Sequence, residues 1–389
     1  MRIALYGGSF NPPHLGHVEA ARTVAEALKP DRFLILPANM PPHKELEPGS
    51  PDGQQRLELC RMAFRDVPKA EVSDWEILRE GKSYTADTVE ALRKIYPEEE
   101  IFLTLGADMF LCLEQWYRFE YLVEQCTLAV FCREGGEEEA LRRCGESLER
   151  RWGARWLLLP HEPLPMSSGE IRHRLKFRLG ADALDDAVYG CIVKNGYYDA
   201  LPELSWLRKK AYAWLDPGRI AHVAGCESEA VLLAKRWGED PELAAEAGIL
   251  HDITKKLSWE EQLNLCEKYG IINDQAEKNT PSILHAKTGA ALAKELFGVE
   301  ERVYEAIRWH CTGKPDMSLL EKIVWLADYS EPTRDFPGVE KIRELAYEDI
   351  DEAMAEALNM TLQHIRSKGR EPYKDTAEAY QWYCREKET

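Results

Sequence analysis

Two histidines at the start of a candidate helix have residue types and spacing suited to phosphate chemistry. They close a run that directly follows an apolar stretch: Gly7-Gly8-Ser9-Phe10-Asn11-Pro12-Pro13-His14-Leu15-Gly16-His17. The leading glycines let the backbone turn tightly, and the unpaired N–H groups of a helix start favour an anionic phosphate. Because His14 and His17 are three residues apart, they share one helix face and can donate hydrogen bonds to phosphate oxygens. The alternative is a pair of surface histidines, but the strand, turn and helix around them favour the phosphate site.

Residues typical of metal ligands recur in the second half of the chain. They are His222, His251, Asp252, His285, His310 and Asp328. A single histidine on an apolar helix face is usually a core residue, but here a His-Asp pair follows an apolar stretch and needs buried partners. Four imidazoles and two carboxylates are more ligands than one zinc ion usually binds, and this number suits two divalent metals. Asp252 could bridge the two metals, and such a pair would serve phosphoryl displacement. Lys255, one turn later, could face the phosphate or be a solvated helix cation.

The elements that must position these residues change character along the chain. Short β-rich runs near 2–6, 32–37, 70–73, 101–105, 127–132 and 155–159 alternate with helical patterns near 16–28, 53–65, 85–95, 117–124, 137–150 and 168–178. This rhythm predicts an α/β fold, whose parallel sheet binds ligands beyond the carboxyl ends of its strands. Later, helical periodicity takes over near 217–237, 240–251, 259–268, 285–297, 300–310, 317–329 and 338–366. We expect two domains, residues 1–203 and an all-α domain of residues 204–389.

Composition argues against several classes of protein. The 389 residues carry a net charge of −18, which disfavours a basic face for nucleic acid but allows a local phosphate pocket. The ten cysteines form no CxxC pair and are expected to be reduced thiols. No apolar run is long enough for a membrane span or a signal peptide. We therefore expect a cytoplasmic protein that binds neither nucleic acid nor membrane, and a homo-oligomer stays an open alternative.

Further motifs follow the histidine turn in order along the first half. They are Pro41-Pro42-His43-Lys44, Ser83-Tyr84-Thr85-Ala86-Asp87-Thr88, Gly106-Ala107-Asp108, Trp116, Arg133 and Ser167-Ser168-Gly169-Glu170-Ile171-Arg172. With the histidine turn, they make residues 1–200 resemble the bacterial nicotinate-nucleotide adenylyltransferases, a Rossmann-like family of nucleotidylyltransferases. Met166 and Gly169 depart from the family's pattern, so we expect altered fine contacts. The resemblance implies transfer of AMP from ATP, with Mg²⁺, to nicotinate mononucleotide, giving deamido-NAD and pyrophosphate.

The same resemblance implies roles for individual residues. The expected catalytic residues are His14, His17, Lys44 and Arg172. The expected substrate contacts are Gly7, Gly8, Ser9, Phe10, Thr85, Asp108, Trp116, Tyr117, Arg133, Ser167 and Ser168.

Some of these substrate contacts have specific parts of the ligand assigned by the resemblance. Trp116 would stack on the pyridine ring, and backbone N–H groups near Thr85 and Tyr117 would hold its carboxylate. Asp108 would lie near the adenosine. Ordinary packing for Trp116 and a loop salt bridge for Arg133 stay open as alternatives. Ser167 also fits a capping box, which is compatible with phosphate binding at the same helix start.

A second resemblance covers residues 204–370. It rests on the histidine and aspartate set and on two runs, Ala306-Ile307-Arg308-Trp309-His310-Cys311-Thr312-Gly313-Lys314-Pro315 and Leu320-Glu321-Lys322-Ile323-Val324-Trp325-Leu326-Ala327-Asp328-Tyr329-Ser330-Glu331-Pro332-Thr333-Arg334. These residues resemble the HD phosphohydrolases that cleave diadenosine tetraphosphate, a dinucleoside polyphosphate, symmetrically to two ADP. The resemblance implies iron, whereas the ligand set alone accepts manganese, cobalt or zinc. Cys311 and Ser330 depart from the family pattern, and neither is expected to be a ligand. A domain that acts on another nucleotide, or that binds one as a regulatory module, stays an alternative.

Overall fold

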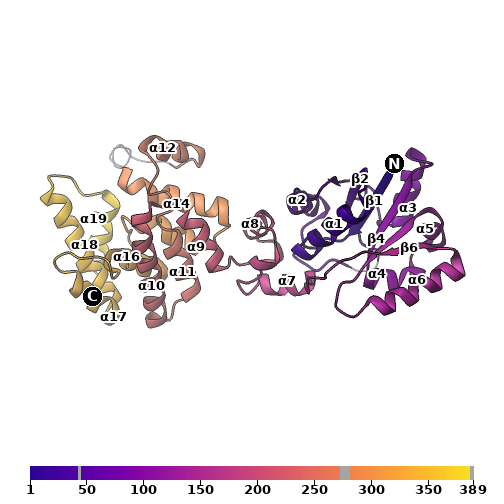
Figure 1. Ribbon diagram of the computed structural model, residues 1–389. Helices are drawn as coiled ribbons and strands as arrows, with labels where there is room; N and C mark the ends of the chain where they lie inside the picture. Colours follow the sequence, from indigo (N-terminus) through magenta and orange to yellow (C-terminus); the bar gives the residue numbers. More distant parts are fainter. Residues whose placement is uncertain (43–44, 272–280, 386–389) are drawn as a thin grey trace. The chain divides into compact units, whose positions relative to one another are not determined.

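Apolar runs bounded by turn residues form the strands of the first unit. The computed structural model describes residues 1–42, 45–271 and 281–385. It divides into two compact units, Met1–Leu201 and Pro202–Thr389, and each is treated by itself. In the described part of the first unit, six strands make one sheet in the order β3-β2-β1-β4-β5-β6, with all neighbours parallel (Figure 1). The strands are β1 Arg2–Gly8, β2 Arg32–Pro37, β3 Ala70–Val72, β4 Glu100–Gly106, β5 Thr127–Phe131 and β6 Arg155–Leu158.

The strand order reverses direction between β1 and β4, which are paired neighbours. In open parallel sheets, ligands bind beyond the carboxyl ends of the strands at such a switch point. Gly8 and Gly106 end these two strands. The histidine turn and Asp108, which follow these ends, therefore lie where this fold binds ligands.

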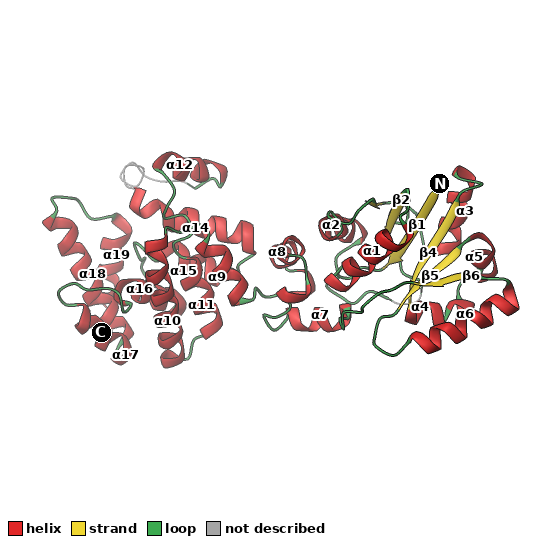
Figure 2. Cartoon of the chain, in the orientation of Figure 1, coloured by secondary structure: helices red, strands yellow, loops and turns green. Residues whose placement is uncertain are grey.

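Helices flank this sheet (Figure 2). They are α1 Leu15–Leu28, α2 Gly53–Ala63, α3 Thr85–Ile95, α4 Ala107–Leu111, α5 Phe119–Gln125, α6 Glu138–Trp152, α7 Ser168–Leu175 and α8 Asp186–Asn195. The α/β prediction is confirmed, and the expected strands and helices appear with ends that shift by a few residues. Neither α4 nor α8 was expected. The core is formed by strand residues such as Leu5, Leu103 and Val130, packed with Val89 and Leu122 from helices.

The second unit is helical throughout its described residues. Its helices are α9 Leu204–Tyr212, α10 Ile220–Trp237, α11 Pro241–Leu250, α12 Trp259–Lys268, α14 Pro281–Phe297, α15 Glu301–Trp309, α16 Leu319–Ser330, α17 Val339–Glu348, α18 Ile350–Ser367 and α19 Lys374–Arg385. The all-α expectation is confirmed, whereas α9 and α19 were not expected.

The helical run expected over 338–366 is wrong in one respect, because the structure breaks it at Asp349. This residue is extended, with φ −146° and ψ 103°, and its carboxylate accepts hydrogen bonds from the N–H groups of Asp351 and Glu352. Such an N-cap satisfies donors that a new helix start leaves unpaired. Two helices therefore replace one.

No helix in the described ranges combines the length and apolar character needed to cross a membrane.

Candidate active sites

The turn between β1 and α1 is shaped by an aromatic side chain that folds back beneath it. Phe10 has a positive φ of 44° and a buried ring. A Cβ atom at Gly8 would lie only 3.0 Å from that ring, so a side chain at residue 8 would require the ring to shift. Phe10 therefore packs under the turn and supports it, while its expected contact with the substrate stays a prediction.

His14 and His17 lie side by side at the start of α1. Their ring centroids are 3.7 Å apart, and His17 Nδ1 accepts a hydrogen bond of 3.2 Å from the His14 backbone N–H. A Cβ atom at Gly16 would approach His14 Nδ1 to 3.1 Å, so the glycine makes room for the ring. The spacing that predicted a shared face has brought the two imidazoles together.

His14 is buried, and its ring nitrogens have no hydrogen-bond partner among the described residues. Burial, with the positive charge of Arg133 as a lesser cause, lowers the pKa of His14 to about 3. The ring is therefore neutral at physiological pH and still has an N–H to donate. A buried polar group without a partner is costly unless a ligand supplies one, which favours a binding role for His14.

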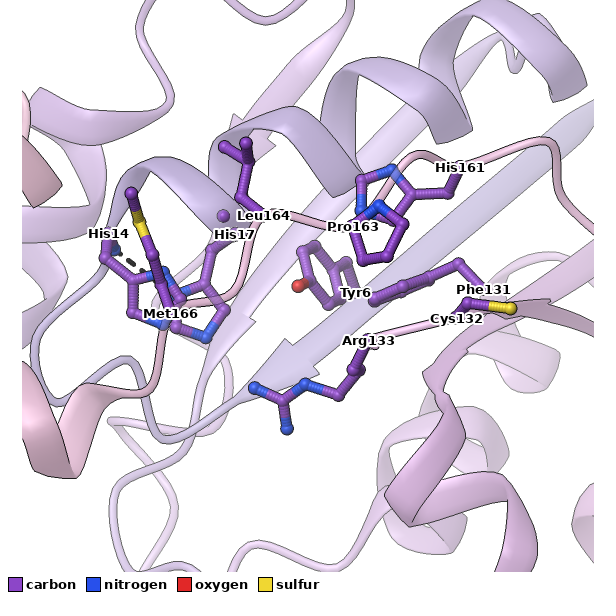
Figure 3. A pocket seen from close by; sticks show the side chains of 11 residues that line it. Tyr6, His14, His17, Phe131, Cys132, Arg133, His161, Pro163, Leu164 and Met166 are labelled. Atoms are coloured by element: carbon purple, nitrogen blue, oxygen red, sulfur yellow. Dashed lines mark hydrogen bonds between the residues drawn. The ribbon is translucent and has the colours of Figure 1, made fainter. Parts of the chain in front are cut away.

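A pocket opens beside these histidines. Figure 3 shows both histidines on one side of the Tyr6 ring. Tyr6 contacts Phe131 edge to face at 6.0 Å between centroids, and Phe131 contacts His161 in the same way at 5.3 Å. The remaining lining residues are Gly16, Cys132, Arg133, Pro163, Leu164 and Met166. The pocket thus combines aromatic walls with imidazole and guanidinium groups, a mixture suited to a nucleotide.

Arg133 and Asp108 stand together at this site. Arg133 Nη1 lies 2.7 Å from Asp108 Oδ2, and a Cβ at Gly106 would approach Arg133 Cδ to 2.9 Å. Arg133 therefore forms a salt bridge, as one of the two interpretations of this residue expected. It also lines the pocket beside His14 and His17.

Helix α7 is tied to the histidine turn by hydrogen bonds. Ser168 Oγ donates to Pro12 O at 3.2 Å, and Arg172 Nη1 donates to Asn11 O at 2.7 Å. Arg172 also pairs with Glu47. Ser167 caps the helix by accepting from the Glu170 N–H. The structure thus gives these residues positioning contacts, while their expected contacts to ATP stay predictions.

The residues expected near the pyridine ring gather around the start of α3. Tyr84 precedes Thr85 and packs on Tyr117 with centroids 4.6 Å apart. Tyr117 is exposed, whereas Trp116 is half-buried and packs against the core. Packing is therefore part of the role of Trp116. Lys44 lies outside the described residues.

Arg56 supports the histidine turn and was missed by the sequence analysis. Its side chain is 0% exposed and donates to Ser9 O and Ala38 O at 2.7 Å each and to Asn39 O at 2.9 Å. Burial lowers the pKa of its guanidinium. The carbonyl groups it joins lie in the loops that follow β1 and β2, so this residue braces both loops. Arg56 is a charged residue among the buried positions of α2, and the sequence does not reveal that it is buried.

The predicted metal ligands of the second unit come together from separate helices. His222 lies on α10, His251 and Asp252 follow α11, His285 lies on α14, His310 follows α15 and Asp328 lies on α16. Buried ligand atoms from these residues form groups in which all atoms lie within 4.8 Å of one another. The structure therefore brings all six residues to one place.

One set of four ligand atoms has the spacing of a single metal position. His222 Nε2 lies 3.0 Å from Asp328 Oδ1, 3.3 Å from His251 Nε2 and 3.7 Å from Asp252 Oδ2. His251 Nε2 lies 3.4 Å from Asp252 Oδ2 and 3.8 Å from Asp328 Oδ1. Metal bonds of about 2.0–2.2 Å in a tetrahedron place ligands about 3.3–3.6 Å apart, so these residues fit a divalent ion.

The other oxygen of Asp252 belongs to a second set. Asp252 Oδ1 lies 3.0 Å from His285 Nε2 and 3.8 Å from His310 Nε2, and these two nitrogens are 3.1 Å apart. Asp252 is thus placed to bridge two positions. Cys311 Sγ lies 3.4 Å from His285 Nε2 and 3.2 Å from His310 Nε2, although the sequence analysis did not treat it as a ligand.

Hydrogen bonds at the opposite ring nitrogens orient three of the imidazoles. The Nδ1 atoms of His251 and His310 lie 2.7 Å from Gly248 O and 2.6 Å from Ile307 O, and His222 Nδ1 lies 3.0 Å from Glu331 Oε1. Each Nδ1 therefore donates to an oxygen, which leaves the Nε2 lone pair facing the cluster, as metal ligation requires. Glu331 is 0% exposed, and it too was missed by the sequence analysis.

Cations surround the two aspartates. Arg219 Nε donates to Asp252 Oδ2 at 2.6 Å, Arg334 Nη2 donates to Asp328 Oδ1 at 2.7 Å, and Lys255 Nζ lies 3.0 Å from His285 Nε2. Burial opposes the charge of Asp252, but His251 and His285 beside it hold the pKa of its carboxyl well below its usual range. Since these three cations are partly exposed, they can also meet an anionic substrate.

Two protein classes correspond to the two units. A Cytidylyltransferase-like family profile matches residues 5–174, and an HD domain profile matches residues 219–333. The second match, together with the histidine and aspartate groups, assigns divalent-metal binding to the helical unit.

One relative defines more closely the class of protein to which the first unit belongs. A probable nicotinate-nucleotide adenylyltransferase of Carboxydothermus hydrogenoformans is 35% identical over 198 residues, which are 51% of this chain and 98% of the relative. The chain therefore belongs, through its first unit, to the nicotinate-nucleotide adenylyltransferase family.

The second unit is similar to known HD proteins. A symmetrical bis(5'-nucleosyl)-tetraphosphatase of Bacillus subtilis is 36% identical over 165 residues, which are 42% of this chain and 88% of the relative. A crystal structure of a predicted HD superfamily hydrolase involved in NAD metabolism from Clostridium acetobutylicum is 35% identical, with a TM-score of 0.46, covering 47% of this chain and 97% of that chain.

Proposed function

We propose that this chain contains two enzymes, of which the first transfers AMP from ATP to nicotinate mononucleotide. The phosphate of nicotinate mononucleotide attacks the α-phosphorus of ATP, and the bond to the β-phosphate oxygen breaks to release pyrophosphate. The product is deamido-NAD. The observation that carries this proposal is the pair of imidazoles at the switch point of the sheet, one of them buried without a partner among the described residues.

In this reaction His14 and His17 donate hydrogen bonds to α-phosphate oxygens as negative charge builds up. Mg²⁺ bound with ATP would neutralise charge on the outer phosphates. Arg172 exchanges its partner Glu47 for those phosphates, and Lys44 adds a further positive charge. Ser167 and Ser168 place the start of α7 beside the same phosphates.

The acceptor is recognised by its ring and its carboxylate. Trp116 packs on the pyridine ring, and backbone N–H groups near Thr85 and Tyr117 bind the nicotinate carboxylate. Hydrogen bonds to a charged group contribute about 1.5–3 kcal/mol, which corresponds to roughly 10–100-fold in rate constant at low substrate concentration.

Paired assays with nicotinate and nicotinamide mononucleotide test this specificity. We expect deamido-NAD and pyrophosphate to form, with kcat/KM about 10–100-fold higher for nicotinate mononucleotide. A chain that prefers the amide, or that uses only a different phosphorylated acceptor, would contradict the proposed substrate.

The second proposed activity is metal-dependent, symmetrical hydrolysis of a dinucleoside polyphosphate, diadenosine tetraphosphate, to two ADP. It is carried by the two ligand sets that share Asp252, with the cations Arg219, Lys255 and Arg334 beside them. His222, His251, Asp252, His285, His310 and Asp328 would hold two divalent metals, iron by family resemblance, and the metals would supply a water activated at neutral pH and charge to neutralise the phosphates. The three cations bind the outer phosphates of the substrate. They hold its tetraphosphate with the central P–O–P bond at the cluster of histidines and aspartates.

The test is product analysis after incubation with Fe²⁺ or Mn²⁺ under anaerobic conditions. Water is added to one inner phosphorus, the bridging oxygen leaves with the other, and ADP is the sole nucleotide product. Formation of ATP and AMP instead would contradict symmetrical cleavage.

A second candidate is a regulatory module, which binds a nucleotide at the three cations without cleaving it. That role would be favoured if the metal-loaded protein binds diadenosine tetraphosphate and yields no ADP. The rate of AMP transfer by the first unit should then change on binding. No ADP from any metal-loaded preparation would refute the hydrolase.

A further inference from the structure

We propose that the thiolate of Cys311 is a ligand of the metal position that His285 and His310 form with Asp252. The inference rests on the proposed metal-dependent function of the second unit, and it adds a sulfur donor to one of the two positions. It makes the two positions chemically different, with nitrogen and oxygen donors at one and a sulfur donor at the other.

Distances among the three donor atoms carry the inference. Cys311 Sγ lies 3.2 Å from His310 Nε2 and 3.4 Å from His285 Nε2, and the two nitrogens are 3.1 Å apart. Metal bonds of about 2.0 Å to nitrogen and about 2.3 Å to sulfur give tetrahedron edges of about 3.3–3.6 Å. The three atoms therefore form a triangle close to the size of one face of a tetrahedral site.

Asp252 lies close to both histidines and is placed to add a fourth donor. Its Oδ1 atom lies 3.0 Å from His285 Nε2 and 3.8 Å from His310 Nε2. Both histidines are nearly inaccessible to solvent, at 1% and 2% exposure, so their ligand atoms face the protein interior. The corresponding corners at the other position are filled by His222, His251 and Asp328, and without Cys311 the second position would have one protein donor fewer.

The local backbone explains how two consecutive residues reach one site. Helix α15 ends at Trp309, and the Gly313 N–H closes a turn onto Trp309 O at 2.9 Å. Within a regular helix, neighbouring side chains diverge and do not share a face. In this turn, which continues through Gly313 at a positive φ of 66°, the side chains of His310 and Cys311 approach the same point.

Ligation replaces the S–H bond with a metal–sulfur bond and releases the proton to solvent. The added negative charge offsets the metal's charge, and a soft sulfur donor favours zinc or ferrous iron over magnesium or calcium. The alternative is a neutral thiol that donates a hydrogen bond to an imidazole. These two states differ in whether sulfur touches the metal, which spectroscopy measures without any assay of activity.

Cobalt titration of the full chain separates the outcomes. Co²⁺ in a protein site gives visible ligand-field bands, and a cobalt–thiolate bond adds a charge-transfer band in the near ultraviolet. We expect both in the wild type, and in Cys311→Ser we expect loss of the charge-transfer band with retained visible bands. Cys226→Ser is the matched control, because Cys226 is a buried thiol beside His251, and it should keep the charge-transfer band.

X-ray absorption of the zinc-loaded chain gives the same answer through bond length. We expect a sulfur shell at about 2.3 Å in the wild type and in Cys226→Ser, and none in Cys311→Ser. Visible bands without a thiolate band in the wild type, or a sulfur shell that persists in Cys311→Ser, would overturn the role of Cys311 alone. Absence of any cobalt binding would overturn the proposed metal centre as well.

Discussion

The two candidate sites differ in how their histidines are arranged along the chain. In the first unit, the histidines lie within one continuous turn between β1 and α1, and the rest of the sheet positions that turn. In the second unit, the proposed metal ligands are spread from His222 to Asp328 and meet only when the helices pack. The histidine pair of the first site therefore depends on a local backbone shape, whereas the cluster in the second unit depends on the tertiary structure around it.

This difference affects what holds each site together. Around the histidine turn, Arg56 and α7 satisfy backbone carbonyl groups directly. In the helical unit, imidazole and carboxylate groups are packed against one another in the interior, where charge is costly without a counter-ion. We therefore expect metal to stabilise the second unit and to leave the first unit unchanged.

Metal removal should give the largest difference between the units. If the wild type is saturated about 1,000-fold above its dissociation constant, chelation lowers the unfolding free energy of the helical unit by about 4 kcal/mol. Hydrogen exchange measured by mass spectrometry should show faster exchange in peptides from α10, α11 and α16, with no change in the β strands. Equal loss of hydrogen-exchange protection in both units would contradict the expectation that metal stabilises the second unit alone.

Arg56→Met should destabilise the first unit by about 3 kcal/mol, because it removes a buried donor and leaves carbonyl groups without partners. Urea unfolding followed by hydrogen exchange would locate the change in the strands and in the histidine turn. Arg61→Met is the matched control, because Arg61 lies on the same helix and is exposed. Equal effects of both substitutions would show that the buried contacts of Arg56 contribute nothing special.

Glu331→Gln should weaken metal binding about 10–100-fold, since the carboxylate that orients His222 is lost. Competition with a chromophoric chelator measures this change, and circular dichroism checks that the helices persist. Glu340→Gln is the control, because Glu340 is an exposed residue on α17. Unchanged affinity in Glu331→Gln would contradict the orienting role.

The smallest expected effect concerns acid stability of the first unit. Burial places the pKa of His14 at about 3, below its value of about 6.5 in the unfolded chain. The unfolded chain therefore binds more protons between these values, and the stability contributed by this residue is lost as pH falls from about 6.5 toward 3. The slope from His14 alone reaches about 1.4 kcal/mol per pH unit.

Unfolding measurements from pH 7 to pH 5 test this linkage. The wild type should lose stability in the first unit more steeply than His14→Gln, whose side chain does not titrate in that range. Parallel curves for the two proteins would show that His14 is not held neutral by burial.

Much of the fold could be predicted from periodicity. Alternating short apolar runs and helical patterns located the strands, and long helical periodicity located the second unit. The five-residue helix α4 is too short to show a period, and the break at Asp349 depends on one cap that the surrounding apolar pattern conceals. A helix too short to show a period and a cap that interrupts an apolar pattern thus explain two of the differences from the prediction.

The sites divide in the same way. His14 and His17 could be proposed from the sequence because their own neighbours resemble a phosphate-binding turn, and the candidate metal ligands because His and Asp are unusual in apolar helices. Arg56 and Glu331 gave no such sign, because their partners Ser9 and His222 lie 47 and 109 residues away. Residues that support a site through distant contacts become visible only in the three-dimensional structure.

We infer that this chain carries two active sites that work independently, and a crossed assay of both activities tests this inference. The His17→Ala and His251→Ala variants of this chain, each incubated with the same metal, are measured for deamido-NAD formation and for ADP formation from diadenosine tetraphosphate. We predict that His17→Ala lowers transfer about 10²–10³-fold and leaves hydrolysis unchanged, and that His251→Ala does the reverse. Loss of both activities in either folded variant, or loss of neither, would contradict the account.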